Sequence, residues 1–225
     1  MRKDKLQTGK LDKWFKTMRR FARTVYKPLF PYKKHGHTQP YNDRAYIFVG
    51  NHLSLFDVVP LAMATDRPVH FMAKSSLFEK GLMKKFVTKC QCIPVNRDGN
   101  DIKAVMQAMK YLKNNESIVI FPEGSRNRTE ETFLPFKSGA AALSIKTKTP
   151  IVPVIQIKKI KFLRRSHVFY GDIIEFSEYY DRHLTDADIK TCDNILYEKM
   201  LNLYNEFQNS LNAKKTKKKN IKKDI

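Results

Sequence analysis

A histidine and an aspartate five residues apart are the pair in this sequence best suited to acid–base chemistry. His52 follows the apolar run 46–50, and Asp57 lies at the start of the next predicted helix. A carboxylate on one ring nitrogen fixes the imidazole tautomer and stabilises the imidazolium, so the other nitrogen can act as a general base. The enzyme nucleophile of a hydrolase triad is missing, so the attacking group would belong to the substrate. The structural alternative is that Ser54-x-x-Asp57 is a helix capping box and His52 an ordinary buried histidine.

An arginine follows another short apolar run. Arg97 lies two residues after the end of the predicted strand 92–95 and enters a turn formed by Asp98 and Gly99. A guanidinium held at such a position can bind a phosphate group through two hydrogen bonds. The alternative is a surface arginine paired with Asp98.

A third polar cluster, Phe-Pro-Glu-Gly-Ser-Arg, occupies residues 121–126 at the end of a predicted strand. Gly124 would let the backbone approach a ligand. Glu123 can accept hydrogen bonds from a polyol, and Arg126 can hold an anion. A plain turn with a charge pair is the alternative, but a strand end with proline, glycine and two opposite charges in six residues favours a site.

The elements that must position these clusters alternate between strand-like and helix-like segments. Strands are predicted at 46–50, 69–73, 92–95, 117–121, 151–157 and 167–176, and helices at 54–65, 102–114 and 139–146. A long closing helix is indicated by one apolar stripe: Ile189, Cys192, Leu196, Met200, Leu203, Phe207 and Leu211. The alternation predicts an α/β fold with a central, mostly parallel sheet flanked by helices. Ligands of such sheets usually bind at the strand ends, where the three clusters lie.

The segment 11–30 reads as a basic amphipathic helix ended by Pro28 and Pro31. Its apolar residues recur at helical spacing, with Lys and Arg over much of the remainder: Trp14, Phe15, Met18, Phe21, Ala22 and Val25. Such a helix can lie in a membrane interface with its apolar face down, or pack on the protein's own core. The tryptophan and the density of cationic residues favour the interface.

Composition bounds the remaining possibilities. The 225 residues are 42% hydrophobic, enough for one sizeable core. We expect a basic amphipathic segment at 1–44, a catalytic domain at 45–212 and a disordered Lys-rich tail at 213–225. The formal charge of +21 predicts a polyanionic partner: nucleic acid, an anionic membrane surface or an acidic protein. The alternative is a generally basic proteome, in which the charge carries little information.

Several classes of protein are disfavoured by what the sequence lacks. It has no apolar stretch long enough for a transmembrane helix, and no signal peptide is expected at residues 1–10. Three cysteines cannot build a disulfide framework, which favours a reduced, cytosolic protein. No metal-ligand spacing, Walker A loop or dinucleotide motif occurs, so we expect neither a metal nor a cofactor.

Taken together, the clusters resemble the glycerolipid acyltransferase superfamily, in particular the 1-acyl-sn-glycerol-3-phosphate acyltransferases. The family motifs occur here in the family's order, over roughly residues 45–160: Asn51-His52 to Asp57, Ile93 to Arg97, Phe121 to Arg126, Phe136 to Ala140 and Ile151 to Val154. Ser125 replaces the usual threonine and keeps its hydroxyl. Relatives often carry an N-terminal membrane-spanning or membrane-dipping segment, a task that falls here to the region Trp14–Leu29 and the basic surface.

The resemblance implies transfer of an acyl chain from acyl-CoA or acyl-ACP to the sn-2 hydroxyl of lysophosphatidic acid. From the basic surface we expect peripheral binding to the cytoplasmic face of the cell membrane. His52 would be the base and Asp57 would orient it. The implied substrate-binding residues are Lys74, Arg97, Glu123, Gly124, Ser125 and Arg126. A glycerol-3-phosphate or lysophospholipid acyltransferase is the near alternative. A basic nucleic-acid-binding protein is the alternative from another class, but it leaves the three clusters without a purpose, so we expect no nucleic acid partner.

Overall fold

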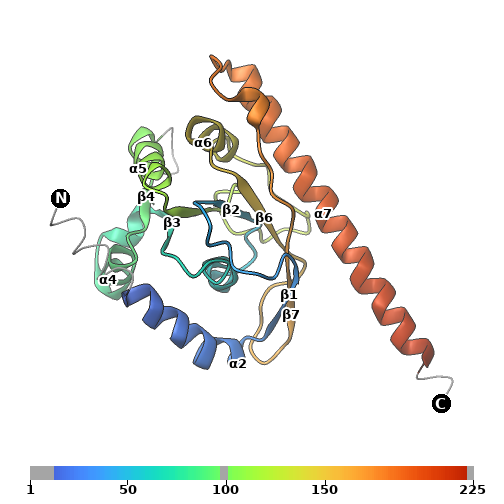
Figure 1. Ribbon diagram of the computed structural model, residues 1–225. Helices are drawn as coiled ribbons and strands as arrows, with labels where there is room; N and C mark the ends of the chain where they lie inside the picture. The colour runs from blue at the N-terminus through green and yellow to red at the C-terminus, as the bar shows by residue number, and fades with distance from the viewer. Residues whose placement is uncertain (1–12, 97–100, 222–225) are drawn as a thin grey trace.

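The computed structural model describes residues 13–96 and 101–221, and over these residues seven strands form one sheet (Figure 1). The strands lie in the order β1-β7-β6-β2-β5-β3-β4. They are β1 (Tyr32–Gly36), β2 (Ile47–Gly50), β3 (Val69–Lys74), β4 (Ile93–Val95), β5 (Ser117–Ile120), β6 (Ile151–Gln156) and β7 (Ser166–Tyr170). All neighbouring pairs are parallel except β6 and β7, which are antiparallel. The predicted α/β class with a mostly parallel sheet is confirmed.

Helices cover both faces of the sheet. They are η1 (Ala22–Tyr26), α2 (Lys27–Leu29), η2 (Leu55–Asp57), α3 (Val58–Ala62), η3 (Ser75–Phe78), α4 (Gly81–Lys89), α5 (Ile102–Lys113), α6 (Ala140–Thr147), η4 (Ser177–Tyr179) and α7 (Asp186–Ile221). One core lies between the sheet and α5, α6 and α7; the other lies between the sheet, α3 and the N-terminal helix. Alternate residues of β2 enter the two cores, because neighbouring side chains of a strand point to opposite faces.

Several elements differ from the sequence prediction. The strands predicted at 46–50, 69–73, 92–95, 117–121 and 151–157 are present with small shifts at their ends. The strand predicted at 167–176 ends at Tyr170, and beyond it Ile174 makes only an isolated bridge to Ile151. The helix predicted at 54–65 is divided into η2 and α3. The short helical turns η3 and η4 were not predicted, and neither were β1 and α4. β1 is a polar edge strand, and α4 is short with exposed apolar residues.

The closing helix α7 has the predicted buried stripe. Cys192, Leu196, Met200 and Phe207 are buried against the domain. The backbone of α7 continues to Ile221 and projects past the sheet (Figure 1). Lysine is a good helix former, and a helix nucleated by packed turns extends at little cost.

The N-terminal helix runs over residues 13–29 as a helix with a π-helical turn at η1. One face of this helix packs on the protein's own core, as one of the two sequence interpretations expects, and the other face leaves apolar side chains exposed. Phe15 and Tyr26 are buried in the core beneath the sheet, whereas Phe21, Val25 and Leu29 are exposed at 55%, 41% and 38%. Since β1 also lies in the sheet, the segment 1–44 is not separate from the catalytic domain: its described part contributes both a helix and a strand to the domain.

A buried arginine fastens this helix to the domain. Arg19 is only 7% exposed, and its guanidinium donates to the carbonyls of Thr65 and Arg67 at 3.2 and 3.1 Å and to the carbonyl of Asp66. Trp14 packs with the small cluster around Val87, and the ammonium of Lys89 lies 3.8 Å from the centre of its ring. The Trp14 ring therefore packs within the protein.

Among the described residues, no helix combines the length and the apolar character that crossing a bilayer requires. No group of three or more His, Cys, Asp or Glu side chains within 13–96 and 101–221 is placed to hold a metal ion.

Removing the Arg19 guanidinium should loosen the N-terminal helix. In Arg19→Ala, three carbonyls lose a charged donor, so we expect the free energy of unfolding to fall by about 1–3 kcal/mol. Urea denaturation followed by circular dichroism measures this change. The neighbouring Arg20→Ala is the matched control, because Arg20 is exposed. Equal stability of the two variants would contradict the fastening role.

Candidate active site

The residue before His52 joins the ends of two strands. The side-chain amide of Asn51 donates to the Gln156 carbonyl at 2.9 Å, and its oxygen accepts from the Gln156 amide at 2.9 Å. Asn51 is 1% exposed. These paired bonds connect the carboxyl ends of β2 and β6, and so fix the backbone from which His52 projects.

Asp57 is the hydrogen-bonding centre of the following turn. Its Oδ2 accepts from His52 Nδ1 at 3.1 Å and from the backbone amides of Leu53 and Ser54, both at 2.6 Å. Its Oδ1 accepts from the Ser54 hydroxyl at 2.7 Å, and Ser54 caps η2 by accepting from the Phe56 amide. The carboxylate is fully buried. The capping box and the oriented histidine, which the sequence leaves as alternatives, are therefore present together.

One nitrogen of the His52 imidazole contacts Asp57, and the other is available to a substrate. Nδ1 faces Asp57, which leaves Nε2 as the nitrogen that can meet a substrate. The ring stacks on Phe121, with centroids 4.1 Å apart and planes at 18°, and its side chain is 13% exposed. This geometry is that of a general base held in one tautomer by a carboxylate.

Glu123 positions His52 through the backbone. Oε1 accepts from the His52 amide at 2.7 Å, and Oε2 accepts from the Leu134 amide at 2.8 Å. Glu123 is 4% exposed, and burial raises the pKa of its carboxyl although the two amides act in the opposite direction. Both carboxylate oxygens are thus occupied by the protein, so the geometry favours a positioning role over the polyol contact expected from the sequence.

The turn after Glu123 also supports the histidine. Gly124 has a φ of +66°, and a Cβ there would lie 3.0 Å from the side chain of Lys137. Glycine therefore serves the turn itself as well as any close approach of a ligand. The amide of buried Asn127 donates to the His52 carbonyl at 2.7 Å, a contact with no counterpart in the sequence prediction. Ser125 and Arg126 are exposed at the end of this turn.

A hollow of about 470 Å³ opens beside the histidine turn. It is lined by Leu53, Ser54, Leu55, Phe56, Arg126, Arg128, Lys159, Ile160 and Lys161. Four of these side chains are cationic, a donor set suited to a phosphate group, and four are large apolar residues. The sequence prediction missed Arg128, Lys159 and Lys161. The sequence feature that could have indicated Lys159 and Lys161 is the basic pair Lys158 and Lys159, which comes soon after β6.

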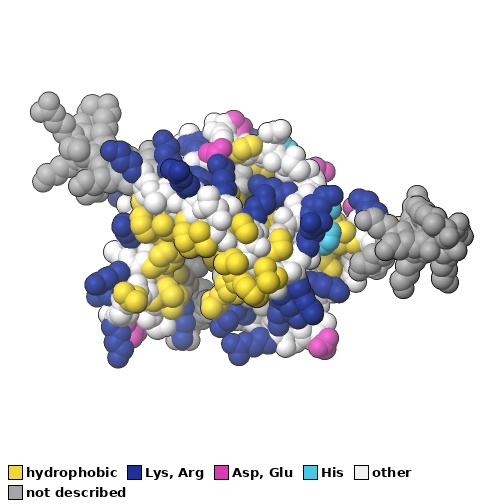
Figure 2. Space-filling view, turned by 90° about the horizontal axis from the view of Figure 1, so that it is seen from below, with side chains coloured by type: hydrophobic (Ala, Val, Ile, Leu, Met, Phe, Trp, Pro, Cys, Tyr) yellow, Lys and Arg dark blue, Asp and Glu magenta, His cyan; other side chains and the backbone are white. Residues whose placement is uncertain are grey.

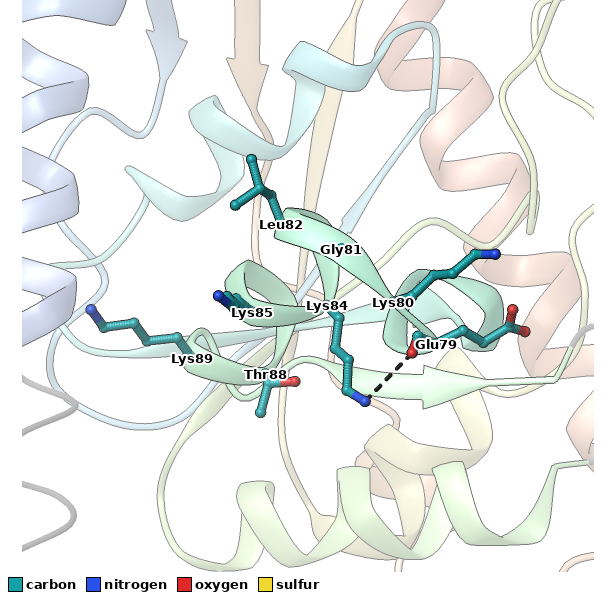
Figure 3. Close-up of a pocket in the computed structure, with 8 residues that line it drawn as sticks. All are labelled: Glu79, Lys80, Gly81, Leu82, Lys84, Lys85, Thr88 and Lys89. Atoms are coloured by element: carbon teal, nitrogen blue, oxygen red, sulfur yellow. Dashed lines mark hydrogen bonds between the residues drawn. The ribbon is translucent and has the colours of Figure 1, made fainter.

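The remaining predicted site residues lie elsewhere or outside the described chain. Lys74 is exposed at the end of β3, which β5 separates from β2. Arg97 lies outside the described residues. A second hollow, of about 820 Å³, runs along α4 and is surrounded by Lys80, Lys84, Lys85 and Lys89 (Figure 3). Lys84 Nζ is turned back onto the Glu79 carbonyl at 3.4 Å.

Exchanging the Glu123 carboxylate for an amide should weaken the two backbone hydrogen bonds of this side chain and destabilise the protein. Glu123→Gln keeps one acceptor oxygen, but its NH₂ group faces a backbone donor, so the free energy of unfolding should fall by about 1–3 kcal/mol. Urea denaturation measures this loss, with Ser125→Ala, an exposed neighbour, as the control. A Glu123→Gln protein as stable as the Ser125→Ala protein would show that these two bonds are dispensable.

Comparison with known proteins agrees with the site geometry. Residues 32–156 match the family model described as Acyltransferase. Over 183 residues the chain is 28% identical to the 1-acyl-sn-glycerol-3-phosphate acyltransferase of Streptococcus pneumoniae, covering 78% of this chain and 67% of that protein. The enzyme of the same name from Helicobacter pylori is 35% identical over 119 residues, covering 52% of this chain and 50% of the relative.

The chain thus spans about half to two thirds of the length of these relatives. Its fold is similar to the crystal structure of the 1-acyl-sn-glycerophosphate acyltransferase PlsC from Thermotoga maritima, with a TM-score of 0.63 and 20% identity over 84% of this chain and 79% of that one. Because the family model covers more than half of the sequence, this protein belongs to the acyltransferase family.

Proposed function

We propose that this protein is a 1-acyl-sn-glycerol-3-phosphate acyltransferase of phospholipid synthesis. It transfers an acyl chain from the thioester of acyl-CoA or acyl-ACP to the sn-2 hydroxyl of lysophosphatidic acid, and releases phosphatidic acid. The observation that carries the proposal is the His52–Asp57 pair, which uses Nδ1 and leaves Nε2 available. The turn that follows His52 lines a hollow with four cationic side chains. The names of the relatives support the same reaction.

In the proposed reaction the substrate hydroxyl is the nucleophile. Nε2 of His52 accepts the hydroxyl proton as the oxygen attacks the thioester carbonyl carbon. Asp57, on Nδ1, stabilises the imidazolium that forms. The tetrahedral intermediate then expels the thiolate, which takes the proton from Nε2. The ester C–O bond replaces the thioester C–S bond, the histidine returns to its starting state, and no acyl-enzyme forms.

The lining of the hollow favours an acceptor that has both a phosphate and a hydrocarbon chain. Arg126, Arg128, Lys159 and Lys161 suit a phosphate monoester, and a lysophospholipid with a cationic headgroup would meet repulsion there. Leu53, Leu55 and Phe56 in the same hollow offer apolar surface that glycerol 3-phosphate would not use. Lysophosphatidic acid has a phosphate for the cationic part of the hollow and an acyl chain for the apolar part.

The donor is expected to approach from the side of α4. Coenzyme A and acyl carrier protein are both polyanions, and the lysines of the second hollow are the cationic group on the β3–β4 side of the site. Lys74 ends β3 immediately before η3 and α4, so its predicted substrate contact belongs to the same side.

We propose further that the protein binds peripherally to the cytoplasmic face of the cell membrane. The exposed stripe Phe21, Val25 and Leu29 on a helix rich in Lys and Arg supports this binding, as does the formal charge of +21.

The reaction can be tested by transfer of a labelled acyl group from acyl-CoA or acyl-ACP to lysophosphatidic acid in anionic vesicles. His52→Ala should lower the rate by about 10²–10⁴-fold, because the general base is lost. Asp57→Asn should also lower it, because the amide is a poorer partner for the imidazolium. Lys113→Ala, an exposed residue of α5 that lines neither hollow, is the control.

Glycerol 3-phosphate and lysophosphatidylcholine should be run as competing acceptors. Preference for either would keep the mechanism and replace the proposed acceptor. Transfer that survives His52→Ala in a folded protein, or no transfer from either donor, would refute the proposed reaction.

Reversing charge on α4 should weaken donor binding. In Lys84→Glu/Lys85→Glu we expect the KM for the donor to rise by about five- to thirty-fold, since each exposed ion pair is worth up to about 1 kcal/mol, with little change in kcat. Steady-state kinetics at low salt measures this change. Lys110→Glu/Lys113→Glu on α5 reverses the same number of exposed charges elsewhere, and an equal rise there would assign the effect to net charge alone.

A further inference from the structure

Six apolar residues from three separate segments form a surface that we call the apolar lip. They are Leu29 and Phe30 at the end of the N-terminal helix, Leu55 and Phe56 in the histidine turn, and Phe162 and Leu163 between β6 and β7. Leu55, Phe162 and Leu163 are exposed at 66%, 59% and 63%. Contact between water and apolar side chains this exposed is unfavourable, and a group of them indicates a surface that meets a partner.

Specific contacts hold the apolar lip in one shape. Phe30 stacks on Phe56 with ring centroids 4.3 Å apart, and its ring centre lies 5.8 Å from that of Phe162. The Leu163 amide donates to the Leu29 carbonyl at 2.7 Å, and the Tyr26 hydroxyl donates to the Phe56 carbonyl at 3.1 Å. Three segments distant in sequence are thus joined into one surface with side chains left facing solvent.

The apolar lip continues directly into the hollow beside the histidine turn. Leu55 and Phe56 belong both to the lip and to the lining of the hollow. In the β6–β7 segment, Lys159 and Lys161 line the hollow, and Phe162 is the next residue along the chain. The boundary between cationic lining and apolar surface therefore lies at the mouth of the hollow.

Cationic residues surround the apolar side chains on this side of the molecule. Figure 2 shows apolar side chains gathered on the face seen from below, with Lys and Arg around them. Arg164 and Arg165, which directly follow the lip in sequence, are exposed. An apolar centre within a cationic rim matches an anionic bilayer, which offers hydrocarbon below a layer of negative headgroups.

We propose that the apolar lip inserts into an anionic bilayer and sets the mouth of the hollow at the level of the lipid headgroups. This inference rests on the proposed function and deepens it, because it adds the β6–β7 segment to the N-terminal helix as a membrane contact. The lysophospholipid passes from the bilayer over Phe56 and Phe162 to His52, with its phosphate moving along the cationic lining and its chain remaining in an apolar environment.

The test is the double variant Phe162→Ser/Leu163→Ser. Binding to vesicles of phosphatidylglycerol and phosphatidylcholine, measured by co-sedimentation, should weaken about tenfold or more. Transfer to long-chain lysophosphatidic acid in those vesicles should fall in parallel. Transfer to a short-chain lysophosphatidic acid, monomeric in solution, should stay within about twofold of wild type, because neither residue touches His52 or Asp57.

Met106→Ser/Ile173→Ser is the matched control, since these side chains are also exposed, at 65% and 43%, but lie outside the lip. A separate variant, Phe162→Trp, keeps the surface apolar. Its added fluorescence, relative to wild type, should shift to shorter wavelength on vesicles and be quenched by lipids with brominated chains.

Several results would overturn the inference. Unchanged vesicle binding by the double variant, or Phe162→Trp fluorescence that does not respond to vesicles, would refute insertion. A wild-type dimer in gel filtration that the double variant abolishes would assign the lip to a second copy of this chain. If wild type transfers no acyl group to any acceptor but the lip variants still lose vesicle binding, the proposed function fails and the membrane contact stands.

Discussion

The buried carboxylate of Asp57 is the interaction on which the rest of the site depends. A charge without solvent is costly unless donors surround it, and four donors do so here. Two of those donors are backbone amides of Leu53 and Ser54, so the carboxylate is satisfied only when the chain turns back on itself after His52. The bonds that stabilise this turn therefore also aim the imidazole, and folding and preparation for catalysis are the same local event.

The three parallel strands β2, β5 and β6 hold this turn in place. Asn51 joins the ends of β2 and β6, while Glu123, just past β5, binds the His52 amide. Parallel strands bring their carboxyl ends to one edge of the sheet, which is why residues distant in sequence meet there. The partly buried amides of His52 and Leu134 each need an acceptor, and Glu123 supplies both with one side chain.

The features that could be predicted from the sequence are those encoded within one short segment of the chain. The central strands are continuous apolar runs, and the His52–Asp57 spacing sits within a single turn, so both were predictable. β1 was not, because its polar residues acquire strand structure only by pairing with β7. The position of Glu123 was predicted, but its contacts were not, because its partners are backbone amides, which carry no residue type. Lys159 and Lys161 become site residues only through the path of the β6–β7 segment.

The order of the strands separates the two substrates of the proposed reaction. β6 and β7 lie on one side of β2, and β5, β3 and β4 lie on the other. The β6–β7 segment brings the cationic lining and the apolar lip, so an acceptor with its phosphate on the first and its chain over the second has its glycerol between them. The lysines of α4 lie on the opposite side. A base between two substrates can take a proton from one and return it to the leaving group of the other, which is the task that Nε2 of His52 must perform.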